Sequence, residues 1–218
     1  MVIFDCNGVL VDSESIASAV LAEAFATVGL ALSADFVARR FHGRRPADIF
    51  DIVERARGKK LPPGFSANVA AKTLRRFRTE LRSIPHAARA LTWVRGPKAV
   101  ASSSTLDRIV MSLDVTGLRH FFDNRLFSAS DVRNGKPAPD LFQRAAARMQ
   151  VRPARCIVVE DSAAGITAAA AAGMTPLGFV GGCDQPGRLA RELLAAGART
   201  VIADMRNLHN TIVDLRGW

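Results

Sequence analysis

Six short apolar runs, separated by segments with helical spacing, constrain the fold of this 218-residue chain more than any other feature. Short apolar runs bounded by turn residues or polar side chains are typical of buried strands. The runs are MVIF (1–4), KAVASSS (98–104), RLFSAS (125–130), CIVVED (156–161), TPLGFV (175–180) and TVIAD (200–204). Because strands that alternate with helices favour one arrangement, we expect an open parallel sheet with helices on both faces.

A block with helical patterns alone lies between the first and second runs. In residues 15–28 apolar side chains recur at helical spacing, and Gly29 ends the pattern. Further helical patterns cover 33–41, 46–57 and 65–82. We interpret the block as an insertion into an alternating pattern. The predicted fold is therefore α/β, with a Rossmann-like parallel-sheet core (1–12 and 84–218) and an inserted all-helical cap domain (13–83).

The chain is strongly basic, with a formal net charge of +10 and a pI near 10.9. Residues 14–85 hold 13 Lys or Arg and 7 Asp or Glu, so the predicted cap is itself basic. This balance favours anionic ligands, including nucleic acid, or reflects a proteome that prefers Arg. Nucleic acid is disfavoured because the chain has no Tyr and only 6% aromatic residues, too few to interleave with its basic groups.

Residues 162–183 carry no charge, which raises the question of a membrane span. The segment is rich in Ala and Gly and is interrupted by Pro176, a pattern that predicts a helix, a turn and a strand. MVIFDC leads directly into a strand, without a basic segment before a long apolar region. We therefore expect no membrane partner and a cytoplasmic location.

Three cysteines, Cys6, Cys156 and Cys183, are an odd number without metal-ligand spacing. Two of them lie beside apolar strand runs, where a free Cys behaves as a small buried hydrophobe. We expect all three to be structural.

Polar side chains follow the predicted strands where each one ends. Asp5 and Asn7 follow the first strand, Ser102 and Ser103 end the second, and Glu160 and Asp161 end the fourth, while Lys136 lies in the loop after the third. In open parallel sheets, ligands bind at the carboxyl ends of the strands. We therefore expect these side chains to meet at one edge of the sheet.

This set of groups suits phosphoryl transfer, which needs a nucleophile, a divalent cation and positive groups around the phosphoryl. A carboxylate such as Asp5 can be the nucleophile if Mg²⁺ and Lys136 offset its repulsion from phosphate. Mg²⁺ prefers oxygen ligands and keeps several waters. Asp5 and Asp161 are thus predicted as direct ligands, with Glu160 just outside or acting through water.

Other groups at this edge can hold the phosphate itself. Gly8 and the neighbouring turn amides allow a close approach of phosphate oxygens, and Ser102 adds a hydroxyl donor. We also count Ser103 among the substrate-binding residues.

Four segments resemble the motifs of haloacid dehalogenase phosphatases, in the family's order and spacing. They are FDCNGVLVDSE (4–14), VASSS (100–104), GKPAPDLF (135–142) and VVEDSAAGITAAAAAGM (158–174). The nearest subgroup has a helical cap after the first motif and includes β-phosphoglucomutase, phosphoglycolate phosphatase and sugar-phosphate phosphatases. The resemblance covers essentially the whole chain. It implies Mg²⁺-dependent hydrolysis through an aspartyl-phosphate on Asp5, with the Asn7 backbone carbonyl as a further metal ligand.

One position departs from the family pattern. The family's phosphatases have Asp two residues after the nucleophile, whereas this chain has Asn7. That Asp acts as general acid and base, and an amide cannot transfer a proton in this way; such a loss costs about 10²–10⁴-fold in rate. Asn7 is either an engineered replacement or a natural residue of a weakly active binder, or another residue or water takes over the acid role.

The segment FHGRRPAD (41–48) resembles the cap loop that meets the substrate in this subgroup. Arg44 and Arg45 are predicted to bind a distal phosphate or carboxylate, since the guanidinium matches both; the alternative is a solvated helix start. We interpret His42 as a structural residue. We expect an exposed helix face at the basic run formed by Lys72, Arg75, Arg76 and Arg78.

We therefore expect a monomeric enzyme that hydrolyses a small phosphorylated metabolite, such as a sugar phosphate. A non-catalytic phosphometabolite-binding protein is the alternative. A β-phosphoglucomutase-type phosphomutase is less favoured, because Ala17 stands where those enzymes carry a His and because a mutase needs the acid/base group twice. Dehalogenase chemistry is disfavoured because Ser102, Lys136 and the acidic pair match phosphate and metal handling.

Overall fold

The computed structural model describes residues 1–41, 44, 46–183 and 185–217. These residues form two compact units, one made of Met1–Asp12 with Arg82–Trp218 and the other of Ser13–Leu81. The predicted boundaries between core and cap fall within two residues of these. We call the first unit the core and the second the helical unit, and describe each by itself.

The core contains a six-stranded sheet in the order β3-β2-β1-β4-β5-β6, in which every pairing is parallel. Its strands are β1 (Val2–Phe4), β2 (Lys98–Ser102), β3 (Leu126–Ser128), β4 (Ile157–Glu160), β5 (Thr175–Phe179) and β6 (Thr200–Ile202). Phe4 of β1 pairs with Val100 on one side and Val159 on the other. All six predicted strands are present, and β1 is central because its three side chains are buried on both faces.

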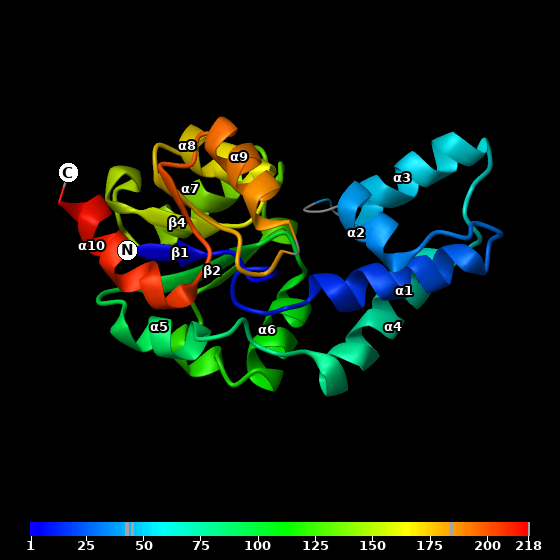
Figure 1. Cartoon of the computed structure of the whole chain (residues 1–218), viewed down its shortest axis with the longest axis horizontal. Helices are drawn as coiled ribbons and strands as arrows, with labels where there is room; N and C mark the ends of the chain where they lie inside the picture. The colour runs from blue at the N-terminus through cyan, green and yellow to red at the C-terminus, as the bar shows by residue number, and fades with distance from the viewer. Residues whose placement is uncertain (42–43, 45, 184, 218) are drawn as a thin grey trace. The chain divides into compact units, whose positions relative to one another are not determined.

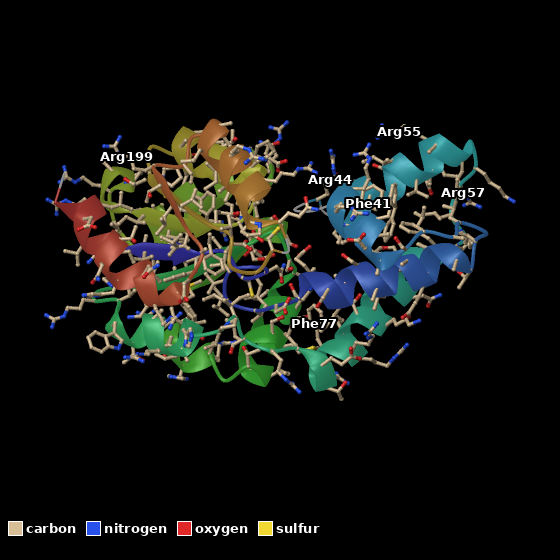
Figure 2. The ribbon with its side chains drawn as sticks, viewed as in Figure 1. Phe41, Arg44, Arg55, Arg57, Phe77 and Arg199 are labelled. Carbon is tan, nitrogen blue, oxygen red and sulfur yellow. The ribbon has the colours of Figure 1, made fainter. Side chains whose placement is uncertain are left out.

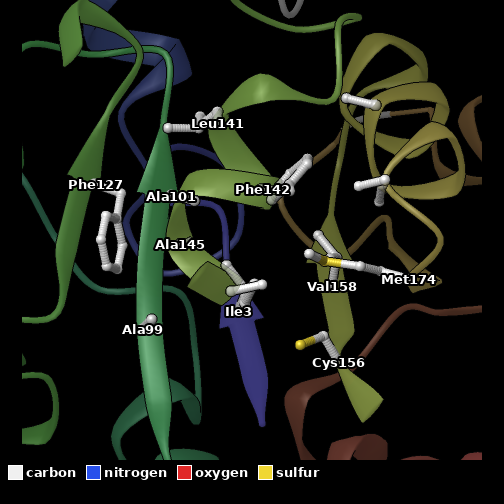
Figure 3. Packing of buried hydrophobic residues seen from close by; sticks show 14 of the residues in the cluster. Ile3, Ala99, Ala101, Phe127, Leu141, Phe142, Ala145, Cys156, Val158 and Met174 are labelled. Atoms are coloured by element: carbon white, nitrogen blue, oxygen red, sulfur yellow. The ribbon is translucent and has the colours of Figure 1, made fainter. Parts of the chain in front are cut away.

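Helices cover both faces of the sheet (Figure 1). α7 (Asp140–Arg148), α8 (Ala163–Ala171) and α9 (Pro186–Ala195) lie on one face, and α5 (Ala87–Trp93), α6 (Leu106–Val115) and α10 (Leu208–Arg216) on the other. α7 packs its apolar side against the sheet, where Phe142 joins Ile3, Ala101 and Val158 in a buried cluster (Figure 3). α10, which follows β6, was not predicted from the sequence.

The helical unit consists of α1 (Glu14–Ala26), α2 (Ala34–Phe41), α3 (Pro46–Arg57) and α4 (Phe65–Glu80). Its interior is built from phenylalanines: Phe65 stacks on Phe25 at 5.9 Å between ring centroids and meets Phe50 edge-on at 5.5 Å. Phe41 and Phe77 are also buried (Figure 2). Each predicted helix of this block is present, since the spacing of these rings is helical.

The chain leaves and re-enters the core through adjacent points. Val11 forms an antiparallel bridge with Ser83. The Asp12 amide donates to the Arg82 carbonyl at 2.9 Å, and the Ile84 amide donates to the Leu10 carbonyl at the same distance. These bonds fix the two crossing segments side by side within the core.

Two further predictions concern a membrane span and the cysteines. No helix among the described residues is long and apolar enough to cross a membrane. The uncharged stretch 162–183 folds as α8, a turn and β5, as its Pro and Gly predict. The three cysteines are free, with Cys6 and Cys156 buried and Cys183 partly exposed.

Candidate active site

The carboxyl ends of β1, β2 and β4 bring polar residues to one edge of the core sheet. Asp5 directly follows β1, and its amide donates to the Val159 carbonyl at 2.9 Å. Ser102 and Glu160 are the last residues of β2 and β4. All three side chains are buried, with Ser102 and Glu160 fully enclosed. The parallel register therefore assembles a polar cluster that water scarcely reaches.

Lys136 joins two of these strand ends. Its Nζ donates to Asp5 Oδ1 at 2.6 Å and to the Ala101 carbonyl at 3.1 Å, and it also forms a short hydrogen bond with Glu160 Oε1. The Lys136 side chain is only 5% exposed. One ammonium therefore holds two buried carboxylates from different strands.

Burial sets the proton affinities of this cluster. Desolvation raises the pKa of Asp5 to about 6, although Lys136 opposes the shift. For Lys136, desolvation alone would lower the pKa, but the two neighbouring carboxylates outweigh it and raise the pKa above its usual range. The lysine therefore stays charged, while Asp5 is more easily protonated than an ordinary aspartate.

Glu160 has both carboxylate oxygens engaged. While Oε1 accepts from Lys136, Oε2 accepts from the Ser162 amide at 3.1 Å and from the Ser162 hydroxyl at 2.9 Å. Ser162 Oγ in turn accepts from the Gly165 amide at 3.1 Å and caps α8. A Cβ at Gly165 would lie 2.0 Å from Glu160 Cδ, so this helix turn can approach the carboxylate only with Gly. These contacts fix the orientation of Glu160.

Asn7 belongs to a second network, made of serines. Its Nδ2 donates to Ser104 Oγ at 3.0 Å, and the Ser104 amide donates to Ser102 Oγ at 3.2 Å. The Ser104 carbonyl accepts from Ser128 Oγ at 2.7 Å. The ends of β2 and β3 thus hold the side chain of Asn7 in place.

Gly8 and Asp161 lie against each other. Gly8 has a left-handed backbone, with φ of 72°, and a Cβ at this position would lie 1.9 Å from Asp161 Oδ2. A Cβ at Gly182 would in turn lie 2.9 Å from the Gly8 carbonyl. Only Gly at position 8 leaves room for the Asp161 carboxylate beside the loop that follows Asp5.

The chemistry of these donors can be compared with that of a magnesium site. The edge holds Asp5, Glu160 and Asp161 against the single ammonium of Lys136, so a divalent cation would offset an excess of negative charge. No group of three His, Cys, Asp or Glu side chains among the described residues is arranged to hold a metal. A cation here would therefore use fewer side chains and complete its shell with backbone oxygens and water, as Mg²⁺ usually does.

The predicted site residues are distributed as follows. Lys136 contacts both Asp5 and Glu160. Asn7 and Ser102 are linked through Ser104, and Ser103 is half-buried beside Ser104. Gly8 adjoins Asp161. Arg44 is exposed after α2 in the helical unit (Figure 2), and Arg45 lies outside the described residues. The roles assigned to all of these residues remain predictions.

Sequence reasoning missed four residues of the two networks: Ser104, Ser128, Ser162 and Gly165. Ser162 carried a usable signal, because a Ser directly after an acidic pair and before an Ala-rich helix is a typical N-cap. Ser104 and Ser128 carried none, since serines at strand ends are common and their pairing depends on the sheet order.

A family model described as a haloacid dehalogenase-like hydrolase matches residues 1–173. The chain belongs to this family. Among relatives of this haloacid dehalogenase-like hydrolase, 6-phosphogluconate phosphatase of Escherichia coli K12 is 36% identical over 174 residues, which are 79% of each chain.

Two solved structures of the family are similar over nearly the whole length. A conserved haloacid dehalogenase-like protein from Agrobacterium tumefaciens superposes with a TM-score of 0.87 at 34% identity, covering 99% of this chain and 98% of the other. A hydrolase from Deinococcus radiodurans, with bound phosphate and sodium, superposes with a TM-score of 0.79 at 31% identity, covering 99% and 95%.

Proposed function

We propose that this haloacid dehalogenase-like hydrolase is a Mg²⁺-dependent phosphatase that acts through an aspartyl-phosphate on Asp5, with turnover impaired by Asn7. The observation that carries the proposal is the contact between Lys136 Nζ and Asp5 Oδ1 at 2.6 Å inside a buried site. A carboxylate and an ammonium held together out of water suit attack on a phosphoryl group better than they suit a structural role at a strand end.

In the first step, a carboxylate oxygen of Asp5 forms a bond to phosphorus and the ester P–O bond breaks. The departing alkoxide then needs a proton. In the second step, a water oxygen attacks phosphorus, the bond to Asp5 breaks and inorganic phosphate leaves. Lys136 contributes in both steps by holding Asp5 and by placing positive charge beside the transferred group. Glu160, fixed by Ser162, acts as a positioning residue for Lys136.

Mg²⁺ would be held by the carboxylates of Asp5 and Asp161 and by the Asn7 backbone carbonyl, with Glu160 just outside. When bound, the ion supplies positive charge that draws phosphate and carboxylate together. Gly8 supports this assignment, because its missing side chain leaves the space in which the Asp161 carboxylate lies.

Asn7 limits the proton transfers. The hydrogen bond from Nδ2 to Ser104 fixes its amide group, but an amide cannot give a proton to the alkoxide or take one from water. Both protons must then move through water, so the chain should cleave esters with good leaving groups first. A non-catalytic binder is the alternative that the same residue favours.

We propose a sugar phosphate or sugar-acid phosphate as the substrate. The relative named 6-phosphogluconate phosphatase supports this class. Arg44 and Arg45 of the helical unit are the candidates for binding the distal carboxylate or phosphate, because each guanidinium can form paired hydrogen bonds with such a group.

The test is phosphate release from a panel of sugar phosphates and sugar-acid phosphates, with and without Mg²⁺, by the chain as it stands and by Asn7→Asp. We expect Mg²⁺-dependent release by both, faster in Asn7→Asp, and none by Asp5→Asn. Acid quenching followed by intact mass should detect phosphate on Asp5. If both the chain as it stands and Asn7→Asp bind these compounds but release no phosphate, the binder is supported instead. Isomerisation of the sugar phosphate without release of phosphate would support a mutase.

A further inference from the structure

A cavity lies in the core, between α5 and the segment formed by η4 (Met205–Asn207) and α10. Its volume is about 250 Å³. α5 and α10 run side by side on the same face of the sheet (Figure 1). The residues that bear on its chemistry are His86, Arg89, Trp93, Arg206, His209 and Asn210. None of the residues assigned to the Asp5 site lines it, so it is a separate site.

The positive charge of this cavity comes from Arg89. The described lining also contains Arg206, whose charge is offset by the neighbouring carboxylate of Asp204. Arg206 is held by Asp204, which accepts from Nη2 at 2.7 Å, from Nε at 3.0 Å and from the Arg206 amide at 2.8 Å. Arg89 is exposed, and within the described part of the chain no carboxylate pairs with it. Asp204 thus fixes and neutralises Arg206, whereas Arg89 has no carboxylate partner among the described residues and can bind an anion.

The cavity also offers an aromatic surface. Trp93 is 56% exposed although its indole is the largest apolar group of α5. Its ring meets the His209 imidazole edge-on, with 6.1 Å between centroids and an angle of 66°. An indole that is supported on one side and exposed elsewhere is a surface on which a planar ring can pack.

His86 of the lining lies at the start of α5. His86 has a left-handed backbone, with φ of 67°, which is uncommon for a residue other than Gly. It follows Ile84, whose amide bonds to the Leu10 carbonyl beside the crossing. This bond holds the backbone before α5, and His86 contributes to the lining.

We propose that this cavity binds a compact anion that carries a flat ring, such as an aromatic phosphonate, phosphate or carboxylate. Arg89 binds the anionic group and Trp93 packs against the ring, while Arg206, held by Asp204, borders the site. The volume is slightly below the range of about 300–1,000 Å³ for small-molecule sites, so a single ring with one anionic group fits better than a larger ligand.

The test uses the full chain and phenylphosphonate, which has no P–O ester bond that a phosphatase could cleave. The sequence has two tryptophans, so Trp218→Phe leaves Trp93 as the only indole reporter. Titration should change Trp93 fluorescence in a saturable manner, and calorimetry should give the same dissociation constant. Methylphosphonate, which lacks the ring, and benzyl alcohol, which lacks the charge, should bind at least about tenfold more weakly.

Variants separate this site from others. Arg89→Gln should weaken phenylphosphonate binding by about 10–100-fold, because a charge-assisted hydrogen bond is lost. Arg148→Gln, at an exposed arginine of α7, is the matched control and should leave binding unchanged. Trp93→Leu should weaken binding by about 2–10-fold, measured by calorimetry, and Trp93→Phe should retain most of it. Asp5→Asn should have no effect.

Three results would overturn the proposal. Equal affinity for phenylphosphonate and methylphosphonate would mean that the ring makes no contact. Equal effects of Arg89→Gln and Arg148→Gln would mean that the cavity does not hold the anion. Dimerisation through Trp93, detected by sedimentation as a change of mass in Trp93→Leu without any probe binding, would make this face a protein interface.

Discussion

The core and the helical unit each contain a lysine–carboxylate pair at the same distance, and the two pairs differ in their surroundings. Lys136 lies 2.6 Å from Asp5 in the core, with the side chains 5% and 9% exposed. Lys72 lies 2.6 Å from Glu23 in the helical unit, with the side chains 43% and 49% exposed. The distance alone therefore does not distinguish a buried pair from a surface pair.

Burial makes the difference in energy and in chemistry. An exposed pair contributes about 0–1 kcal/mol, whereas removal of one partner from a buried pair costs about 3–5 kcal/mol. Burial also raises the pKa of Asp5 to about 6. Buried charges are costly, and buried charged groups with shifted pKa values are typical of functional sites.

The largest expected effect is on turnover and comes from replacing the side-chain amide of Asn7 in the core by a carboxylate. Asn7→Asp should raise turnover by about 10²–10⁴-fold, most for alkyl phosphates, because it restores the general acid and base. Asn68→Asp makes the same change at an exposed position of α4 and should leave turnover unchanged. Steady-state kinetics on alkyl and aryl phosphates measure both.

The Asn7 measurement needs a check on purity. Asn followed by Gly is prone to deamidation, so intact mass should be recorded on fresh protein before residual activity is assigned to Asn7. If pure Asn7 protein matches Asn7→Asp on alkyl phosphates, another residue is the acid and the role given to position 7 is wrong.

The next effect is on stability and compares the two pairs directly. Lys136→Met should lower the free energy of unfolding by about 3–5 kcal/mol, because Asp5 and Glu160 are left buried without a cation. Lys72→Met should change it by less than about 1 kcal/mol. Urea denaturation of the two variants gives both values. Similar losses of unfolding free energy in both would mean that burial does not set the cost of removing the lysine.

Two glycines with left-handed backbones allow a smaller comparison. Gly64, at the start of α4, has φ of 79° and nothing within 4 Å of an added Cβ, so Gly64→Ala should cost about 1–2 kcal/mol from backbone strain alone. Gly8→Ala should cost more, because the new methyl group displaces Asp161. It should also weaken Mg²⁺ binding in calorimetry, whereas Gly64→Ala should not. An unchanged Mg²⁺ affinity in Gly8→Ala would argue against Asp161 as a ligand.

The smallest effect concerns pH. Since the pKa of Asp5 is raised to about 6, its carboxylate is ionised above that pH and protonated below it. A metal must displace this proton, so the apparent Mg²⁺ affinity should be level above pH 6 and fall by up to about tenfold per unit well below it. Calorimetry between pH 4.5 and 8 checks this, with Asp5→Asn as a control that should lose the step near pH 6.

The sequence predicted the fold to within a few residues because the strands are short apolar runs and the helices are periodic. It missed α10, for which no helical pattern was singled out after residue 204. At the site, Asp5, Lys136 and Glu160 could be placed together because Asp5 and Glu160 lie at strand ends and Lys136 lies in the loop after the third strand. Their exact hydrogen-bond partners could not be predicted. The contact between Asn7 and Ser104, for example, depends on how the loops after β1 and β2 fold.

The paired crossing segments make the helical unit a replaceable part. Because the Asp12 amide bonds to the Arg82 carbonyl, residues 13–81 begin and end at neighbouring points of the core. A short Gly-containing turn could join those points, and the central strand β1 would keep both of its partners. The haloacid dehalogenase-like core could thus exchange its insertion without a change in its own topology. Under the proposed function, substrate choice and the chemistry at Asp5 would then evolve on separate stretches of one gene.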